Sequence, residues 1–412
     1  MARKMKDSGI EWIKSIPENW TCKRGKQLFI ETNERSIAGT EELLTVSHIT
    51  GVTPRRQKNV NMFMSESLTG YKICHPGDIA ANTMWLWQGA VGVSNYHGVI
   101  SPSYNTYRQR INDYDPKYLD YLLRIQPLID TYAAYSTGIT LSRLRLYPES
   151  FLSIYFIVPP LTEQQHISSY LDVHCSEIDA MLSKTRSSIE EYKKLKQAVI
   201  TQAVTKGVRG EREMKDSGVE WIGEINHRFS LIKLKYICSI LDQYRKPISA
   251  DKRSQSGSIL YDYYGASGAI DKIDDYTIDD HVMLIGEDGA NLRMRNLPLM
   301  YEVNGKAWIN NHAHILKPTE RVDFYYLFYA LEGLDINPYI TGSAQPKLSQ
   351  ENLQNIWVPL PNLEEQQEIA THIRSKCTEI DGLIAKKEQL VKELESYKKS
   401  LIYEIVTGKR EV

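Results

Sequence analysis

Two long stretches of the chain, residues 163–204 and 365–406, carry apolar side chains at alternating intervals of four and three residues. Neither stretch contains proline, and Gly382 is the only glycine within them. This spacing is the seam along which coiled-coil helices pair. Proline before each stretch and Gly207 or Gly408 after it are helix start and stop signals. The pattern therefore predicts two long helices. Their seam positions are Leu171, Cys175, Ile178, Leu182, Ile189, Tyr192, Val199 and Ala203, then Ile373, Cys377, Ile380, Ile384, Val391, Leu394, Leu401 and Ile405.

An apolar seam of this length needs a second apolar surface, and the other helix is the obvious partner. A long solvated helix attached to a globular body is the alternative. Parallel and antiparallel pairing both remain open, but antiparallel pairing would give a pseudo-two-fold unit with one body at each end. At 1.5 Å per residue, roughly forty residues would make a rod of about 60 Å.

Short segments of the amino-acid sequence are repeated in the two halves of the chain, in addition to the helical periodicity. "MKDSGIEWI" at 5–13 returns as "MKDSGVEWI" at 214–222, and "LTEQQHISSYLDVHCSEID" at 161–179 is answered by "LEEQQEIATHIRSKCTEID" at 363–381. Matched positions include Asp179 with Asp381 and Lys196 with Lys398. The segments between share only fragments, so duplication followed by divergence of the middles is the simplest account.

The divergent middles read as mixed α/β bodies. Short runs typical of strands are "SIYFIVPP" (153–160), "HVMLIG" (281–286) and "NIWVPLP" (355–361). The predicted class is α+β, with two α/β bodies separated by two long antiparallel coiled-coil helices in a pseudo-two-fold tandem repeat. The predicted boundaries are 1–160 for the first body, 161–212 for the central helix, 213–361 for the second body and 362–412 for the C-terminal helix.

Composition narrows the class of protein. A chain of 412 residues is too long for one core, and 42% hydrophobic with 25% charged residues is typical of a soluble globular protein. No apolar run is long enough to span a membrane, and the N-terminus lacks a secretory pattern. Five scattered cysteines without a CxxC motif favour reduced thiols. A cytoplasmic location is expected.

Motifs for catalysis were not found. The sequence has no GxxxxGK[ST] phosphate loop and no HExxH zinc motif. A DNA amino-methyltransferase needs an Asn/Asp/Ser-Pro-Pro-aromatic loop, but "SPSY" (101–104) and "NPYI" (337–340) both lack the second proline. We expect no catalytic residues, no metal site and no cofactor in this chain.

Charge gives a mixed signal for nucleic acid. Residues 1–158 carry 18 basic and 14 acidic side chains, whereas residues 213–360 carry 15 and 20. A protein that binds nucleic acid alone is usually more basic. Local patches of Arg, Lys, Asn, Gln and His beside aromatic residues nevertheless have the groups needed for phosphate and base-edge contacts. The candidate residues are Arg55, Arg56, Lys58, Asn82, Tyr104, Arg143, Arg145, Tyr244, Arg245, Arg293, Arg295, Asn310, His312, Gln345 and Lys347.

The organisation as a whole resembles one family, the specificity (S) subunits of type I restriction-modification systems. The resemblance is carried by "LTEQQHI" and "LEEQQEI" at the openings of two matched helices. "PGDI" (76–79), "GVISPSY" (98–104), the repeated tags, "GSAQPKL" (342–348) and, more loosely, "GITLSRL" (138–144) add to it. Each motif alone is weak, but their duplicated order is specific and covers essentially the whole chain.

This resemblance implies that each body reads one half of a split, asymmetric DNA site. The helices would fix the spacing of the half-sites and dock two modification (methyltransferase) subunits, with Gln164, Gln165, Gln366 and Gln367 as expected docking residues. The partners would bind S-adenosylmethionine, and restriction subunits would supply ATP- and Mg-dependent translocation and cleavage. The repeated segments would then form two equivalent docking surfaces, and the divergent segments would recognise two different DNA sequences.

Two other functions remain open. A coiled-coil adaptor that presents two protein-binding bodies without DNA would use the same helices, and the acidic second body favours it. A recognition subunit of a methylation-only assembly would share every feature named above. The acidic run "DKIDDYTIDD" (271–280) has no place in a DNA contact, and we expect it to lie away from the phosphates.

Overall fold

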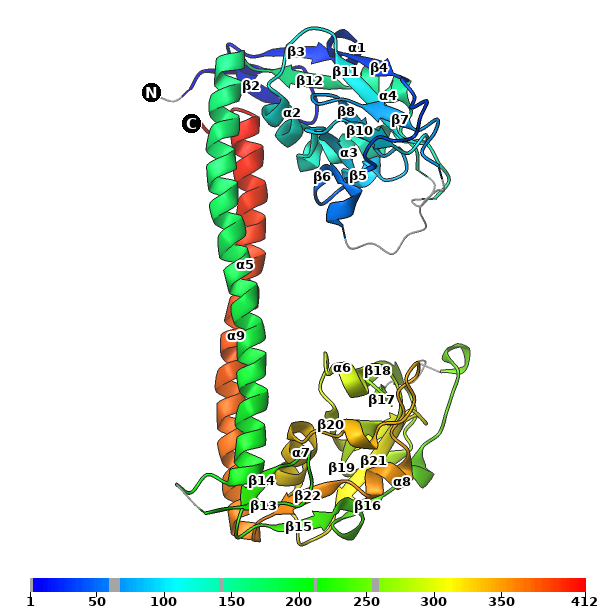
Figure 1. The fold of residues 1–412 in the computed structure, drawn as a ribbon, viewed down its shortest axis with the longest axis vertical. Coiled ribbons are helices and arrows are strands. Elements are labelled where there is room, and N and C mark those ends of the chain that lie inside the picture. Colours follow the sequence, from blue (N-terminus) through cyan, green and yellow to red (C-terminus); the bar gives the residue numbers. More distant parts are fainter. Residues whose placement is uncertain (1–2, 59–66, 141–143, 211–212, 254–258) are drawn as a thin grey trace. The chain divides into compact units, whose positions relative to one another are not determined.

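A computed structural model describes residues 3–58, 67–140, 144–210, 213–253 and 259–412 (Figure 1). The chain forms two units. Unit 1 comprises residues 1–185 and 389–412, and unit 2 comprises residues 186–388. Both long helices run through the two units, so each unit contains one body together with half of each helix.

The two predicted helices are confirmed as α5 (Leu161–Lys206) and α9 (Leu363–Val406). Their seams are covered, because Leu171, Ile373 and Ile405 are fully buried. Within unit 1, the start of α5 lies against the end of α9, where Lys398 Nζ is 2.6 Å from Asp179 Oδ1. Within unit 2, the end of α5 lies against the start of α9 in the same way. The pairing in each unit is therefore antiparallel.

Unit 1 is built on a four-stranded antiparallel sheet with the order β4-β11-β8-β9. The helices α2, α3 and α4 contribute fully buried side chains, among them Tyr118, Tyr132 and Phe151, to a core that also includes seam residues of α5 and α9. Its elements are β1 (Met5–Asp7), β2 (Ser15–Pro17), β3 (Thr21–Arg24), α1 (Gly25–Leu28), β4 (Phe29–Thr32), β5 (Leu44–Ser47), β6 (Gly51–Pro54), β7 (Lys72–Cys74), β8 (Ile79–Ala81), β9 (Val91–Val93), β10 (Gly98–Ile100), β11 (Asn105–Gln109), α2 (Pro116–Leu123), α3 (Gln126–Tyr135), α4 (Pro148–Ser153) and β12 (Tyr155–Val158).

Unit 2 has a six-stranded sheet with the order β16-β21-β19-β20-β17-β18, in which β17 and β20 are parallel. Its first four strands match the order in unit 1, since β16, β21, β19 and β20 take the places of β4, β11, β8 and β9. Its elements are β13 (Met214–Asp216), β14 (Glu224–Asn226), β15 (Ser230–Lys233), β16 (Cys238–Ile240), β17 (Tyr261–Gly265), β18 (Gly268–Ile273), β19 (Ile278–Gly286), α6 (Asn291–Met294), β20 (Met300–Ile309), β21 (Ala313–Pro318), α7 (Phe324–Gly333), α8 (Gln350–Gln354) and β22 (Trp357–Leu360).

The repeated tags form matching hairpins. In unit 1, β1 pairs with β2, the backbone N–H of Gly9 donates to Asp7 (3.0 Å), and Gly9 has φ +68°. In unit 2, β13 pairs with β14, and Gly218 at φ +70° donates to Asp216 (2.9 Å). A left-handed φ favours glycine because that residue has no Cβ. The repeated "DSG" thus encodes the same turn twice.

The ends of both helices follow the sequence signals. Gly207 has φ +80° and Gly408 has φ +70°, as helix-terminating glycines usually do. A Cβ on Gly408 would lie 2.5 Å from Pro17 and 3.0 Å from Trp20, so the end of α9 packs closely on the tag segment. The predicted strands at 153–160 and 355–361 are confirmed as β12 and β22, and the predicted strand at 281–286 is confirmed as the second part of β19. The predicted α+β class with two sheet-containing bodies and two packed helices is confirmed.

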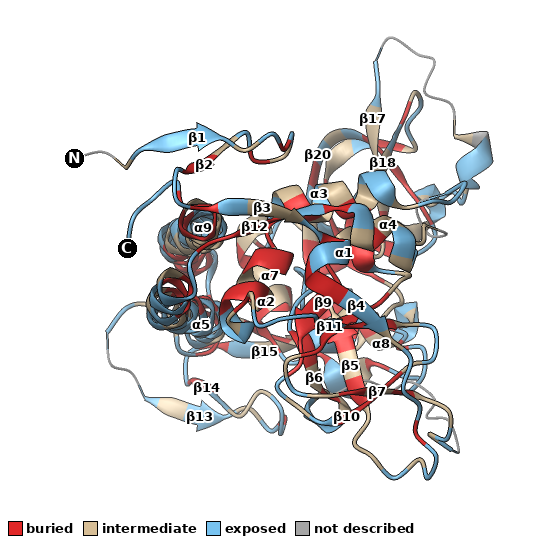
Figure 2. Ribbon diagram, turned by 90° about the horizontal axis from the view of Figure 1, so that it is seen from above, coloured by how far each residue is buried: buried red, intermediate tan, exposed pale blue. Residues whose placement is uncertain are grey.

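Burial shows where each unit is held together. The inner strands of both sheets and one face of α2 and α7 are buried, while β1, β13 and the outer faces of α5 and α9 are largely exposed (Figure 2). The five cysteines are free thiols, four of them buried. No helix in the described ranges has an apolar stretch that could span a bilayer.

Candidate nucleic-acid interface

Some of the predicted contact residues gather at one end of each sheet. In unit 1, β8 ends at Ala81 beside the first residue of β11, Asn105. In unit 2, β19 ends at Gly286 beside the first residue of β21, Ala313. The residues that follow one strand therefore meet those that precede its neighbour. We call these places the sheet end of unit 1 (residues 82–83 and 103–104) and the sheet end of unit 2 (residues 287–289, 310–312 and 345–348).

The sheet end of unit 1 is neutral. Asn82 is buried, and its side-chain amide donates to the Tyr104 hydroxyl at 2.9 Å. The Asn82 carbonyl oxygen accepts from the backbone N–H of Met84, and the Thr83 hydroxyl donates to Ser103 O at 2.7 Å. Burial raises the pKa of Tyr104, and the positive charge of Arg55 acts in the opposite direction. Asn82 and Tyr104, predicted separately, are thus brought together.

The basic patch "TPRRQK" follows β6 in unit 1. Arg55 lies close enough to Tyr104 to influence its pKa. Arg56 is largely exposed and forms an ion pair with Glu42 at 2.7 Å. Lys58 donates to the Ser47 hydroxyl at 2.9 Å, and burial lowers its pKa. Of these three residues, the structure relates Arg55 most directly to the sheet end of unit 1.

In each body, a single antiparallel β-bridge lies ahead of the last strand. In unit 1, Thr137 and Arg145 exchange two backbone hydrogen bonds of 2.9 Å. In unit 2, Thr341 and Lys347 exchange two of 2.8 Å. Arg145 and Lys347 therefore occupy equivalent positions. Arg143, predicted with Arg145, lies outside the described residues.

The sheet end of unit 2 is charged. Lys347 Nζ lies 3.1 Å from Glu287 Oε1, and Arg245 pairs with the other oxygen of the same carboxylate. His312 Nδ1 lies 2.7 Å from Asp288, while the Asn310 side chain accepts from the His312 backbone N–H. Four predicted residues, Arg245, Asn310, His312 and Lys347, thus converge from three segments of the chain.

A buried histidine anchors this cluster. His314 is 1% exposed, with Nδ1 2.6 Å from Asp242 Oδ2 and Nε2 2.8 Å from Leu348 O. Asp242 also pairs with Arg245 at 3.1 Å and accepts from the Ile315 backbone N–H. The contacts tie the loop of Lys347 to the sheet. Asp242, Glu287, Asp288 and His314 were not predicted from the sequence, where the run "GEDG" (286–289) after a buried strand was a signal for Glu287 and Asp288 alone.

The remaining predicted residues of unit 2 are placed differently. Tyr244 and Gln345 are exposed near the cluster, and the tight turn at Gly342 brings a Cβ position within 2.3 Å of Gln345 O. Arg293 donates to Ile340 O at 2.9 Å. Arg295 donates to Glu332 O and Leu334 O, and burial lowers its pKa. Arg295 is therefore held within its unit by backbone carbonyls.

The acidic run of unit 2 is paired with basic side chains. Asp271 lies 2.8 Å from Arg253, and Asp280 lies 2.5 Å from Lys317. These two carboxylates are compensated locally, which reduces the repulsion that this stretch would exert on a polyanion.

Two of the four glutamines expected to dock partners are buried, and each connects a long helix to its own body. Gln164 is fully buried, accepts from the Asp115 backbone N–H (2.8 Å) and donates to Pro159 O (2.8 Å). Gln366 repeats this arrangement with Asp323 (2.8 Å) and Pro361 (2.9 Å). Asp115 and Asp323 cap α2 and α7 through the backbone N–H groups of Tyr118 and Tyr326. Buried side chains offer a partner no surface, so both glutamines join a long helix to its body.

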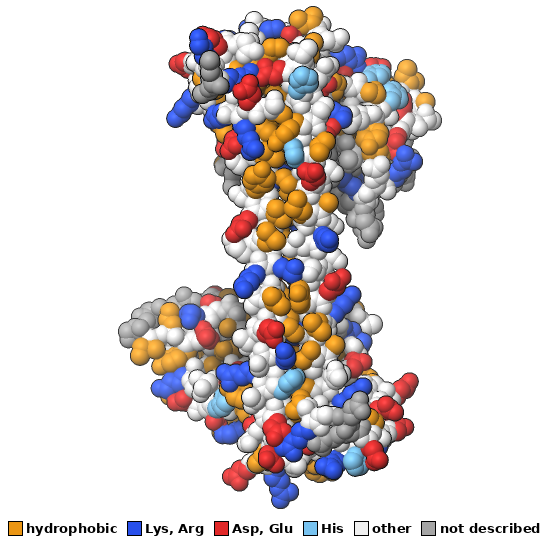
Figure 3. Space-filling model, turned by 90° about the vertical axis from the view of Figure 1, so that its left-hand side faces the viewer, with side chains coloured by type: hydrophobic (Ala, Val, Ile, Leu, Met, Phe, Trp, Pro, Cys, Tyr) orange, Lys and Arg blue, Asp and Glu red, His pale blue; other side chains and the backbone are white. Residues whose placement is uncertain are grey.

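The neighbouring glutamines, Gln165 and Gln367, are exposed. Apolar side chains also lie along one face of the long helices (Figure 3). Those on α5 and α9 with at least two-fifths of their surface exposed are Leu161, Val173, Met181, Leu195, Leu363, Leu390 and Tyr397. Exposed apolar side chains in a row are typical of an interaction surface.

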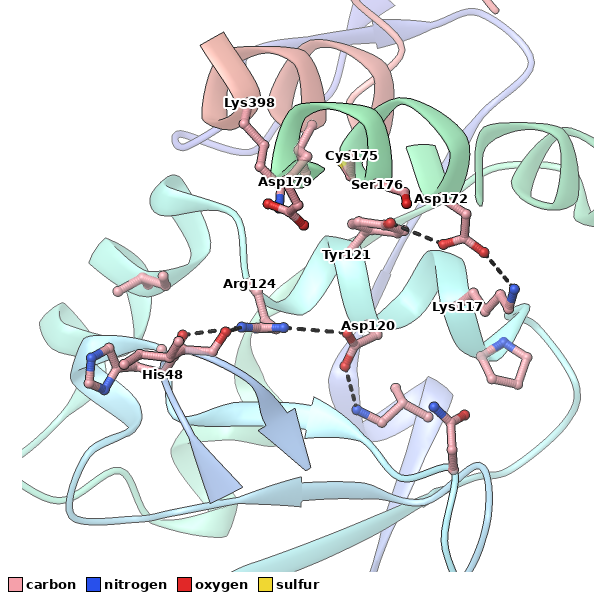
Figure 4. A pocket seen from close by; sticks show the side chains of 17 residues that line it. His48, Lys117, Asp120, Tyr121, Arg124, Asp172, Cys175, Ser176, Asp179 and Lys398 are labelled. Carbon is pink, nitrogen blue, oxygen red and sulfur yellow. Dashed lines mark hydrogen bonds and ion pairs between the residues drawn. The ribbon is translucent and has the colours of Figure 1, made fainter. Parts of the chain in front are cut away.

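A hollow of about 710 Å³ lies in unit 1 between α2, the turn after β5 and the long helices (Figure 4). Its charged groups are already engaged. Lys117 and the Tyr121 hydroxyl contact Asp172 at 2.5 and 3.0 Å, and Arg124 contacts Asp120 at 3.6 Å, a carboxyl whose pKa is raised by burial. None of the predicted contact residues lines it. Within the described ranges, no group of His, Cys, Asp and Glu could hold a metal ion.

Comparison with known proteins places this geometry in a family. Residues 227–393 match the family model of the type I restriction modification DNA specificity domain. A putative type I restriction enzyme specificity subunit of Haemophilus influenzae is 32% identical over 39% of this chain, an alignment that spans only 37% of that protein. The MjaVIII specificity subunit of Methanocaldococcus jannaschii is 26% identical over 79% of this chain and 78% of its own length.

Solved structures share the fold. A chain from a study of complex assembly and conformational transition of the type I R-M system superposes with a TM-score of 0.72 at 14% identity, covering 96% of this chain and 99% of that one. The HsdS subunit of Thermoanaerobacter tengcongensis gives 0.50 at 16% identity, over 96% and 98% of the two chains. These structures show the fold. The family model identifies residues 227–393 as a type I restriction modification DNA specificity domain, and the chain as a whole is similar to the specificity (S) subunits of type I restriction-modification systems.

Proposed function

We propose that this chain reads a bipartite, asymmetric DNA site, with one half-site for each body. The first body (1–160) would use the sheet end of unit 1 and Arg145, and the second body (213–361) the sheet end of unit 2. Members of the family are the non-catalytic subunits of their complexes. The chain would therefore select the sequence, and other subunits would modify it.

One observation carries this proposal. The two bodies share the order of their four central strands, yet the residues after the matching strands β8 and β19 are entirely different. Conserved architecture with different polar groups at one end of a sheet suits two readers of different sequences, because base edges are distinguished by their donors and acceptors. A single repeated ligand would favour matching groups instead.

The helix segments (161–212 and 362–412) would dock two modification subunits. The exposed Gln165 and Gln367 and the row of exposed apolar side chains support this role. The partners would carry S-adenosylmethionine, and restriction subunits, where present, would use ATP and Mg²⁺. The complex would work in the cytoplasm on double-stranded DNA.

The test is an exchange of one body. Replacing residues 20–150 by the equivalent body of another S subunit, in a complete complex, should change one half-site in a map of methylated adenines and leave the other intact. A chimera that folds but alters both half-sites would contradict the assignment of one body to one half-site. A complex that fails to retard duplex DNA at low salt would instead support a protein adaptor.

A further inference from the structure

A row of ionisable side chains crosses the sheet end of unit 2, from the buried imidazole of His314 to the half-exposed side chain of Lys347. Asp242 contacts both His314 (2.6 Å) and Arg245 (3.1 Å). Glu287 contacts Arg245 through one carboxylate oxygen and Lys347 (3.1 Å) through the other. The link between the buried anchor and the exposed ammonium is therefore Glu287.

The position of Glu287 is fixed on both sides by backbone hydrogen bonds. Its N–H donates to His312 O at 2.8 Å, and its carbonyl accepts from the Leu348 N–H at 2.7 Å. The side chain is 15% exposed. Burial alone would raise the pKa of Glu287, but hydrogen bonds from Arg245 and Lys347 outweigh it and hold that pKa below its usual range. The carboxylate is thus charged at neutral pH and rigidly placed.

The fold does not need an acid at this position. In unit 1 the first residue after the matching strand is Asn82, which makes neutral hydrogen bonds with Tyr104 and Met84. The same strand order is therefore built without a carboxylate or its two cations. A half-buried ion-pair network is costly to desolvate, so its presence in one body only calls for a role beyond the scaffold.

We propose that Glu287 is the positioning residue that presents Lys347 to a base edge in the second half-site. This inference rests on the proposed function. Lysine loses about 2 kcal/mol of rotamer entropy when its side chain is fixed, and a side chain fixed before binding no longer incurs that cost at the interface. The matching acceptors on duplex DNA are O6 and N7 of guanine.

A base edge suits this site better than a phosphate. A mobile lysine contacts a phosphate well, so a fixed ammonium adds little there. Moreover, Arg245 contacts the carboxylates of Asp242 and Glu287, and Lys347 contacts that of Glu287, so a phosphate group at this place would be repelled by these carboxylates. A fixed donor beside carboxylates therefore favours an uncharged acceptor at a defined place.

The experiment uses the full chain assembled with its modification subunits. Glu287→Gln keeps the size of the side chain and removes its charge. Asp280→Asn is the matched control, because Asp280 forms a carboxylate–lysine pair with Lys317 at the start of the same strand, β19. Methylation rates are measured on duplexes in which each base pair of both half-sites is replaced in turn. Thermal unfolding of each variant checks that it folds.

The expected result is a loss of discrimination at one base pair of the second half-site by about tenfold in Glu287→Gln, the size of one specific base contact. The first half-site and the Asp280→Asn complex should be unchanged. Lys347→Met should abolish the same discrimination, and Glu287→Gln should then add nothing to it, because both act through one ammonium.

Several outcomes would overturn this inference. They are unchanged discrimination in a folded Glu287→Gln complex, additive effects of the two substitutions, and a uniform loss across all sequences, which indicates a phosphate contact. These outcomes are distinct from a failure of the proposed function, in which the wild-type complex would itself show no dependence on the second half-site.

Discussion

The two sheet ends occupy the same place in matching sheets and use opposite chemistry. In unit 1, Asn82, Thr83, Ser103 and Tyr104 form a neutral hydrogen-bonded group. In unit 2, the corresponding strands carry Glu287, Asp288, Asn310 and His312, joined by cations from two other segments. If the sheet ends read DNA as proposed, strand order would set where recognition occurs, and the side chains after the strands would set what is recognised.

The contacts of the long helices with the bodies and with each other, by contrast, are alike in the two units; we call these contacts the joints. Gln164 and Gln366, and the ion pairs Lys398–Asp179 and Lys196–Asp381, are alike in both units. All of these residues lie in segments whose sequence is repeated, whereas the sheet ends lie in segments whose sequence differs between the two halves. The predictions below test whether the joints are interchangeable and the sheet ends are not, beginning with the largest effect.

Replacing either buried glutamine by alanine should destabilise its own unit by about 3 kcal/mol, because a backbone N–H and two carbonyls lose their partner in a buried place. Gln164→Ala and Gln366→Ala should cost similar amounts, as measured by hydrogen exchange in each unit. The exposed neighbours provide the control, since Gln165→Ala and Gln367→Ala should each change stability by less than about 0.5 kcal/mol. Unequal costs for the two clamps would show that the joints are not equivalent.

Replacing the equivalent cations should affect one half-site each. Arg145→Ala should weaken binding at the first half-site, and Lys347→Ala at the second, by about 1–3 kcal/mol. The measurement is the affinity of the assembled complex for duplexes with one half-site scrambled. Lys317, which is not a candidate contact residue and pairs with Asp280, gives the control variant Lys317→Ala. Loss at both half-sites from a single substitution would remove the division between the bodies.

Breaking one helix ion pair should have a modest effect that is the same in either unit. Asp179→Asn and Asp381→Asn should each cost about 0.5–1 kcal/mol, because both pairs are partly exposed and screened by solvent. Reversing a pair, as in Asp179→Lys with Lys398→Asp, should restore most of the loss in thermal unfolding. Failure of the reversal would assign the loss to packing along the seam.

The smallest expected effect concerns the stability of each unit at acidic pH. The pKa of Glu287 is lowered in the folded state, so its contribution to stability is complete above the unfolded value and is lost as pH falls through the folded one. Glu287→Gln should therefore make the acid unfolding of unit 2 less steep, between about pH 5 and pH 3. The pKa of Asp120 in unit 1 is raised by burial, so Asp120→Asn should change the slope for unit 1 in the opposite sense. Equal slopes in wild type and Glu287→Gln would contradict the lowered pKa.

Sequence periodicity predicted the helices well, because a seam of sixteen positions is a long and redundant signal. The strands next to long helices were also recognisable. The sheet end of unit 2 was only half predictable. Arg245, Asn310, His312 and Lys347 could be predicted by residue type. The contacts of Arg245 and Lys347 with Glu287, and of His312 with Asp288, could not, because they depend on the order β16-β21-β19, which joins segments about seventy residues apart. The roles of Gln164 and Gln366 were equally hidden, since repetition alone does not distinguish a buried clamp from an exposed docking residue.

The shared helices have a consequence for inheritance. Each unit takes the beginning of one helix and the end of the other, and the aspartate and lysine that pair stand at repeated positions in both. A genetic exchange within the repeated helix text would therefore bring in a foreign body on a helix that still finds its lysine or aspartate. If each body reads one half-site as proposed, recombination at these positions would create a new combination of half-sites in one step, while point mutation would have to rebuild a sheet end residue by residue.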